Sequence, residues 1–169
     1  SKREFEETCR YVSSMDTSGQ ADRSLCLHIS AHGNESGLGW GPDEVDCEAL
    51  ADTVGAFVER PTSNMEKRII VLTACYAEKQ QLSERIKKLV QRGKIEFPPK
   101  YLFCSSGEVA WQDAAVGWTL FYHLLPEVDL DNRRSVQDVL NKIKAVGIGQ
   151  FYYFRWDESG LKYKRFAAT

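Results

Sequence analysis

The sequence predicts an α/β fold built on a mostly parallel sheet, for three reasons. Apolar runs of strand length at residues 24–31 and 68–74 are each followed by a stretch with helical spacing of its apolar residues, at 46–58 and 78–91. Strands that alternate with helices in this way pair in parallel through right-handed crossovers. Two further strand-like runs near the end of the chain flank a turn at residues 157–160, which predicts a C-terminal β-hairpin.

The size and composition of the chain are typical of one globular domain. Its 169 residues are 43% hydrophobic, so we expect residues 1–169 to fold as a single unit. A domain near this size buries about 70% of the surface of its unfolded chain, which makes a stabilising disulfide or metal unnecessary. The 22 basic and 24 acidic residues give a net charge of −2 and are dispersed, so we expect neither direct nucleic-acid binding nor attachment to a membrane.

The first part of the chain contains a helix, a loop and a strand. Apolar residues recur at helical spacing in residues 2–14, and a polar, turn-rich loop follows at 15–23. Residues 24–31 place apolar or small side chains on both faces, which suits a central parallel strand. The glycine-rich segment 33–42 is predicted to be a loop. Because the first strand follows a helix, we expect an opening strand of the sheet to lie before residue 1.

The middle of the chain repeats the helix and strand pattern. Asp46 is a plausible N-cap for the helix at 46–58. Residues 68–74 form a nearly continuous apolar, β-branched run, which predicts a buried strand. The helix at 78–91 carries one apolar stripe, and Gly93 is expected to end it.

The last third of the chain adds one more strand and two helices before the hairpin. A strand is predicted at residues 101–104 and a helix at 114–125. Ser135 and Asp138 resemble a capping box at the start of the next helix, and Gly147 is expected to close it. The pattern gives no sign of a repeat or a linker.

The cysteines indicate a reducing compartment. There are five of them, an odd number, and no CxxC pair is present. They are Cys9, Cys26, Cys47, Cys75 and Cys104. This usage predicts free thiols in a cytoplasmic protein, and it disfavours a thiol-transfer function, which needs a second cysteine close to the first.

Two reactive side chains follow predicted strands directly. His32 comes after the strand at 24–31, and Cys75 comes after the strand at 68–74. Reactive groups in open α/β sheets collect at the carboxyl ends of adjacent strands, so this pair suits a cysteine nucleophile with a histidine partner. The backbone amides of Gly33 and Cys75 are candidate donors to an oxyanion. The alternative is that Cys75 is a small buried hydrophobe and His32 a satisfied turn residue.

The other two histidines have simpler explanations. His28 lies within the strand at 24–31, too far before His32 to reach the strand end, and is expected to be a core residue. His123 lies on a late helix and is expected to be structural.

The two strands resemble a known family. The run LHISAHG at residues 27–33 is similar to the "LH…HG" strand of the CHAT subgroup of caspase-like cysteine peptidases, and VLTAC at 71–75 is similar to the group's "VLSAC" strand. Asp113 ahead of a helix, and the amphipathic helix at 135–146, also resemble the family pattern. The similarity covers most of the chain.

The resemblance implies a fold and an activity. The fold is a three-layer caspase-like fold, with helices on both faces of the sheet. The activity is that of a cysteine endopeptidase, in which Cys75 is the nucleophile, His32 the general acid or base, and the amides of Gly33 and Cys75 the oxyanion hole. It implies no cofactor and no metal. The alternative is a catalytically inactive caspase-like module that only binds partners.

The family also suggests a biological setting. Its domains act on protein substrates and commonly sit beside a regulatory or sensor domain or subunit, in bacterial defence and cell-death pathways among others. We expect the same kind of partner here.

The substrate pocket is predicted from acidic residues near the expected cleft. Asp113, Glu108, Asp46 and Glu35 would suit a basic side chain before the scissile bond, and Asp113 is favoured because it follows the third strand. Asp113 is equally suited to capping a helix that starts at residue 114. Trp40 is interpreted as a loop anchor or as a substrate-facing aromatic.

Overall fold

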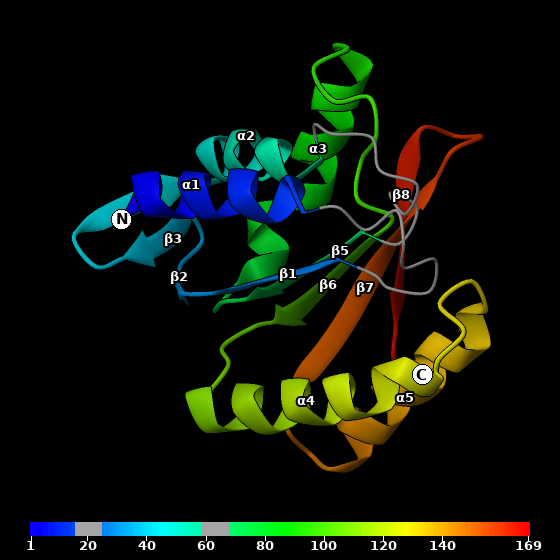
Figure 1. Cartoon of the computed structure of the whole chain (residues 1–169). Coiled ribbons are helices and arrows are strands. Elements are labelled where there is room, and N and C mark those ends of the chain that lie inside the picture. Colours follow the sequence, from blue (N-terminus) through cyan, green and yellow to red (C-terminus); the bar gives the residue numbers. More distant parts are fainter. Residues whose placement is uncertain (16–24, 59–67) are drawn as a thin grey trace.

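A central sheet of five strands organises the molecule, for which the computed structural model describes residues 1–15, 25–58 and 68–169. In spatial order the strands are β1 (Cys26–Ser30), β5 (Ile69–Thr73), β6 (Tyr101–Ser106), β7 (Gln150–Asp157) and β8 (Lys162–Ala167) (Figure 1). The three strands β1, β5 and β6 are parallel, whereas β7 and β8 pair antiparallel. The sheet is therefore mixed rather than mostly parallel, because the predicted C-terminal hairpin joins it directly.

Helices cover both faces of this sheet. The helices α1 (Lys2–Ser13), α2 (Cys47–Val58) and α3 (Leu82–Gln91) pack on one face, and α4 (Trp111–Leu124) and α5 (Arg133–Ala145) pack on the other (Figure 1). Helices α1 and α2 lie close to the predicted positions 2–14 and 46–58. The resulting α/β architecture has three layers. Among the described helices, none is both long and apolar enough to cross a membrane.

Strand β5 explains how the sheet holds two cores. Its side chains alternate between the faces, so Ile70 and Leu72 join the core beneath α1 to α3, while Ile69 and Val71 join the core beneath α4 and α5. All five residues of β5 are buried. The continuous apolar run in the sequence is therefore that of a buried strand, as predicted, and this strand lies between β1 and β6.

Strand β1 differs from its prediction. It lies at one edge of the sheet as described, paired only with β5, and was expected to be central. Leu27 and Ile29 are buried, but His28 and Ser30 reach the surface because the helices on that face cover the edge only in part. The loop predicted at 15–23 lies outside the described residues except for Met15.

The glycine-rich segment after β1 is not the loop that its composition predicts. It forms a small antiparallel sheet of β2 (His32–Gly33), β3 (Gly37–Trp40) and β4 (Asp43–Asp46). Glycine is needed for close packing at Gly37, where an added Cβ would come within 2.5 Å of the Val45 carbonyl oxygen. The prediction failed because glycine here provides room for a neighbouring strand rather than flexibility.

Capping side chains mark where helices α2 and α5 begin. Asp46 accepts hydrogen bonds from the amides of Glu48 (2.9 Å) and Ala49 (2.7 Å), which confirms it as the N-cap of α2. At α5 the cap is Asn132, whose side chain accepts from the amide of Arg134 (3.0 Å). The helix therefore begins at Arg133, and the capping box predicted at residue 135 is wrong.

Two other helices begin away from their predicted positions. The segment predicted as one helix from residue 78 is divided into the 3₁₀ turn η2 (Ala77–Gln80) and α3, because Gln81 adopts a left-handed conformation (φ 51°). Helix α4 begins at Trp111, three residues before the predicted start, and it runs into the 3₁₀ turn η3 (Leu125–Glu127).

The side chain of His28 connects three elements. Its Nε2 lies 2.8 Å from Thr73 Oγ1 on β5, and its Nδ1 lies 3.0 Å from the hydroxyl of Tyr122 on α4. The ring also packs edge-on against Trp118. His28 was expected in the core; it instead joins the sheet edge to α4, and partial burial lowers its pKa by desolvation.

Acidification is expected to weaken the fold through His28. Because its pKa is lower in the folded chain, the unfolded chain binds the proton more readily, so the contribution of His28 is complete above about pH 6.5 and declines as the pH falls below it. Melting temperatures at pH 7.5 and 5.5 test this. The fall between them should be smaller in His28→Gln than in the unmodified protein. His123→Gln, which removes an exposed histidine from α4, is the matched control. Equal falls in the unmodified protein and His28→Gln would contradict the prediction.

Candidate functional site

The ends of β1 and β5 bring His32 and Cys75 to the same edge of the sheet. Ser30 is in register with Thr73, and the amide of Ala31 donates to the Thr73 carbonyl at 3.1 Å. Each candidate residue follows its last paired residue by two positions. The parallel pairing predicted from the two apolar runs thus places the imidazole and the thiol at neighbouring strand ends.

Gly33 brings the two strand ends into direct backbone contact. A Cβ at this position would lie 2.4 Å from the Cys75 carbonyl oxygen and 2.9 Å from Cβ of Ala74. No real side chain occupies such a space, so any other residue would push the segment after His32 away from Cys75. The lack of a side chain, rather than an unusual backbone conformation, is what this position requires.

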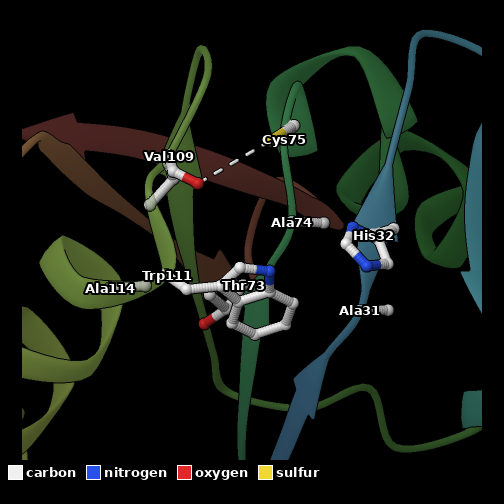
Figure 2. Close-up of a pocket in the computed structure, with 8 residues that line it drawn as sticks. All are labelled: Ala31, His32, Thr73, Ala74, Cys75, Val109, Trp111 and Ala114. Carbon is white, nitrogen blue, oxygen red and sulfur yellow. Dashed lines mark hydrogen bonds between the residues drawn. The ribbon is translucent and has the colours of Figure 1, made fainter.

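A small pocket lies between these strand ends and the start of α4. It is lined by Ala31, His32, Thr73, Ala74, Cys75, Val109, Trp111 and Ala114 (Figure 2). Its volume is about 20 Å³, which is close to the space that one water molecule needs. Both candidate catalytic residues border this pocket. Among the lining residues, His32 is the one neighbour of Cys75 that can titrate or carry a charge.

The thiol and the imidazole are not hydrogen-bonded to each other. Cys75 is half-buried, and its Sγ lies 3.8 Å from the Val109 carbonyl oxygen, to which it donates. The His32 ring is exposed and packs edge-on against the Trp111 indole, with 5.6 Å between ring centroids and an angle of 89°. The two side chains thus border the same pocket, and each of them contacts a different residue there.

The turn after Cys75 is held in place by β6. The hydroxyl of Ser105, which is fully buried, donates to the Ala74 carbonyl (3.0 Å) and accepts from the Ala74 amide (3.3 Å). The Tyr76 amide donates to the Gly107 carbonyl (2.8 Å), with Tyr76 in a left-handed conformation (φ 56°). Within the described part of the chain, the Cys75 amide has no hydrogen-bond partner, so its N–H is available to a ligand.

A buried glutamine joins the cysteine segment to the histidine segment. Gln80 has no exposed surface, and its Nε2 donates to the carbonyls of Asn34 (2.7 Å) and Gly37 (3.0 Å), which belong to the hairpin after His32. The Cys47 thiol donates to its Oε1 at 3.0 Å. Sequence reasoning missed Gln80, since nothing in the local pattern separates it from its neighbour Gln81.

The predicted acidic pocket residues lie apart from this pocket. Asp46 caps α2, Glu35 pairs with Lys79 (2.9 Å), and Glu108 accepts from the hydroxyl of Tyr76 (2.7 Å). None of them is a lining residue. Their role in binding a substrate stays a prediction.

Asp113 and Trp40 complete the set of predicted pocket residues. Asp113 lies in the first turn of α4, where a carboxylate is favourable near the positive end of the helix. The alternative that it caps this helix is wrong, because Ala110 occupies the N-cap position. The Trp40 ring packs against that of Phe5 at 4.5 Å between centroids with a 34° tilt, so it anchors α1 to the hairpin.

The structure also identifies one residue that the sequence did not suggest. Trp111 lines the pocket and contacts His32, yet it is 51% exposed. An exposed tryptophan at the start of a helix is uncommon, so the residue type alone was a hint of a role for Trp111. The direction of its side chain, however, depends on where α4 begins. Among the described residues, no group of three or more His, Cys, Asp or Glu side chains is arranged to hold a metal ion.

Comparisons of the chain with protein-family models, curated proteins and solved structures give no match. The assignment of a function therefore depends on the geometry of this site and on the family resemblance of its two strands.

The five thiols should differ sharply in reactivity. Burial raises the pKa of Cys9 and Cys104 to about 12, and desolvation also raises the pKa of Cys26 and Cys47, so little thiolate forms at these four positions at neutral pH. We expect iodoacetamide at pH 7.5 to modify Cys75 first, as measured by peptide mass spectrometry. Modification of Cys104 before Cys75 in the folded protein would contradict this.

Removal of the Gln80 amide should loosen the connection between the two segments. Gln80→Leu takes the donor away from the Asn34 carbonyl, removes one of the two donors of the Gly37 carbonyl and leaves the Cys47 thiol without the Oε1 acceptor, and losses of this kind typically cost about 1–3 kcal/mol. We expect a loss of that size in the free energy of unfolding measured with urea. Gln91→Leu, an exposed position at the end of α3, is the control. Equal stability of the two variants would show that Gln80 does not hold the segments together.

Proposed function

We propose that this chain is a cysteine endopeptidase of the caspase-like class, which hydrolyses a peptide bond of a protein substrate through Cys75 and His32. One observation carries the proposal: Gly33 packs against the backbone of Cys75 and Cβ of Ala74, and an imidazole and a thiol border one pocket at adjacent strand ends. A nucleophile and a base are useful together only at such short range.

The reaction follows from the groups present at this pocket. His32 takes the proton of the Cys75 thiol, and the thiolate sulfur bonds to the substrate carbonyl carbon. The negative charge that forms on the carbonyl oxygen is stabilised by the N–H groups of Cys75 and Gly33. His32 then gives its proton to the leaving amine as the C–N bond breaks, and water hydrolyses the acyl-enzyme with the same imidazole as base.

The absence of a hydrogen bond between the two side chains is compatible with this mechanism. Catalytic hydrogen bonds are often long in a free enzyme and shorten when the substrate binds. Rotation of the Cys75 side chain away from the Val109 carbonyl would turn Sγ toward the imidazole. The unengaged amide of Cys75 supports its role as an oxyanion donor.

The three-layer arrangement supports the caspase-like assignment. A histidine follows one parallel strand and a cysteine follows the neighbouring strand, with helices on both faces of the sheet. The free state of all five cysteines supports a reducing, cytoplasmic setting. We extend the proposal to control by a regulatory or sensor domain or subunit and to a defence or cell-death pathway, on the family resemblance alone.

A second function is favoured by one observation. The Cys75 thiol is directed at the Val109 carbonyl and not at His32, as in a module that keeps the fold of a peptidase but only binds partners. Such a module needs no reactive thiol. The two functions are separated by the same experiment.

Loss of either reactive side chain should abolish peptide cleavage. The protein is incubated with a peptide library prepared from a whole proteome, and new termini are identified by mass spectrometry. Cys75→Ala should yield none, and His32→Ala should be slower by about 10²–10⁴-fold, the usual contribution of a general acid or base. Both side chains lie at the edge of the core, so melting temperatures should change little.

The control for this experiment is Cys26→Ser, which removes a thiol outside the pocket and should keep full cleavage. Cleavage by Cys75→Ala at the rate of the unmodified protein would overturn the assignment. A lack of cleavage by the unmodified protein would favour the binding module.

A further inference from the structure

The pocket beside Cys75 lies where a substrate side chain must enter. When Sγ bonds to the substrate carbonyl carbon, the Cα of the residue before the scissile bond is one bond further away. Its side chain therefore starts within a few ångströms of the thiol. The pocket bordered by Cys75, His32 and Trp111 is the described cavity that meets this condition (Figure 2).

The size of the pocket restricts that side chain. The volume of about 20 Å³ accommodates a group of roughly one water molecule, which is also the scale of a methyl group. Three alanines, Ala31, Ala74 and Ala114, form its walls with small side chains, and all three are buried. Ala31 directly follows β1, Ala74 directly follows β5 and Ala114 lies on α4, so the walls come from three packed parts of the fold.

The chemistry of the pocket restricts the charge of the side chain. None of the lining residues is an aspartate, glutamate, lysine or arginine. The hydroxyl of Thr73 is already engaged with His28 Nε2 at 2.8 Å. A charged side chain would lose its water there, and His32, the one lining group that can carry a charge, is already used by the Cys75 thiol in the proposed reaction, so the exchange is unfavourable.

Trp111 determines the width of the pocket. Its indole lines the pocket on the side of α4 and stands edge-on to the imidazole of His32. Since the side chain is half exposed, it contributes a wall without being part of the core. Shortening it should widen the pocket and leave the fold intact.

We propose that this pocket receives the residue before the scissile bond and selects a small uncharged side chain, alanine first, with Trp111 as the residue that limits size. This rests on the proposed peptidase function. It differs from the expectation of a basic residue paired with Asp113, whose carboxylate is not among the groups that line the pocket.

The experiment uses peptidyl acyloxymethyl ketones that differ only at the residue next to the ketone: alanine, leucine, lysine or aspartate. These probes carry no residue after the reactive carbon, so they report only on the side chain before the cut. The measurement is the second-order rate of labelling at Cys75, followed by intact mass and peptide mapping.

The alanine probe should label Cys75 faster than each of the other probes by about tenfold or more, since even one methylene discriminates by about that factor in a tight pocket. Trp111→Ala should raise the leucine rate relative to the alanine rate by a similar factor. If Trp111→Ala slowed labelling only because His32 lost its contact with the indole, the rates of all probes would fall alike. The ratio of the leucine rate to the alanine rate would then stay unchanged.

The matched control is Ala115→Val, which adds bulk to an exposed position on the same turn of α4. It should leave the ratio unchanged, whereas Ala114→Val should fill the pocket and lower the alanine rate by about tenfold. Melting temperatures of all variants check that each one folds.

The outcomes separate this inference from the proposed function. Labelling of Cys75 that does not depend on the probe, or that is fastest with leucine, overturns the small pocket while the peptidase function stands. A preference for the lysine probe that Asp113→Asn removes overturns it in favour of the acidic pocket. Failure of every probe to label Cys75 overturns the peptidase function and this inference with it.

Discussion

The contact between Gly33 and the backbone of Cys75 is the constraint on which the site depends. An added Cβ would meet the Cys75 carbonyl at 2.4 Å, so the two strand ends are as close as backbones without side chains can be. This contact holds the segment that carries His32 against the segment that carries Cys75, and the two residues border one small pocket.

Buried polar groups keep this close approach in place. Ser105 fixes the backbone just before Cys75 from β6, and Gln80 fixes the turn after Cys75 to the hairpin after His32. The Ser105 hydroxyl binds the amide and the carbonyl of Ala74, and Gln80 binds the Asn34 carbonyl and is a second donor to the Gly37 carbonyl, so displacement of either segment would cost hydrogen bonds. The reactive side chains themselves make few contacts, so the rigid parts of the site are its supports, and Cys75 and His32 retain freedom to rotate.

The fold was predictable where the signal was local. The runs that became β5 and β6 have the length and the apolar content of buried strands, and Asp46 has the cap position that its residue type favours. Predictions failed where contacts with other parts of the chain determined the local structure. The glycine-rich segment 33–42 forms part of the small antiparallel sheet of β2, β3 and β4, in which Gly37 of β3 lies against Val45 of β4. Helix α4 starts at Trp111 rather than at residue 114.

The sequence by itself determined that a histidine and a cysteine each follow a strand, and that these two strands pair in parallel, because a strand end is set by the local change from apolar residues to a turn. The arrangement of the groups around and between His32 and Cys75 was decided by the tertiary structure. The edge position of β1, the connection through Gln80 and the narrow pocket beside Trp111 all arise from contacts between residues far apart in the chain. Such contacts depend on how helices and strands pack, and local patterns do not encode their distances.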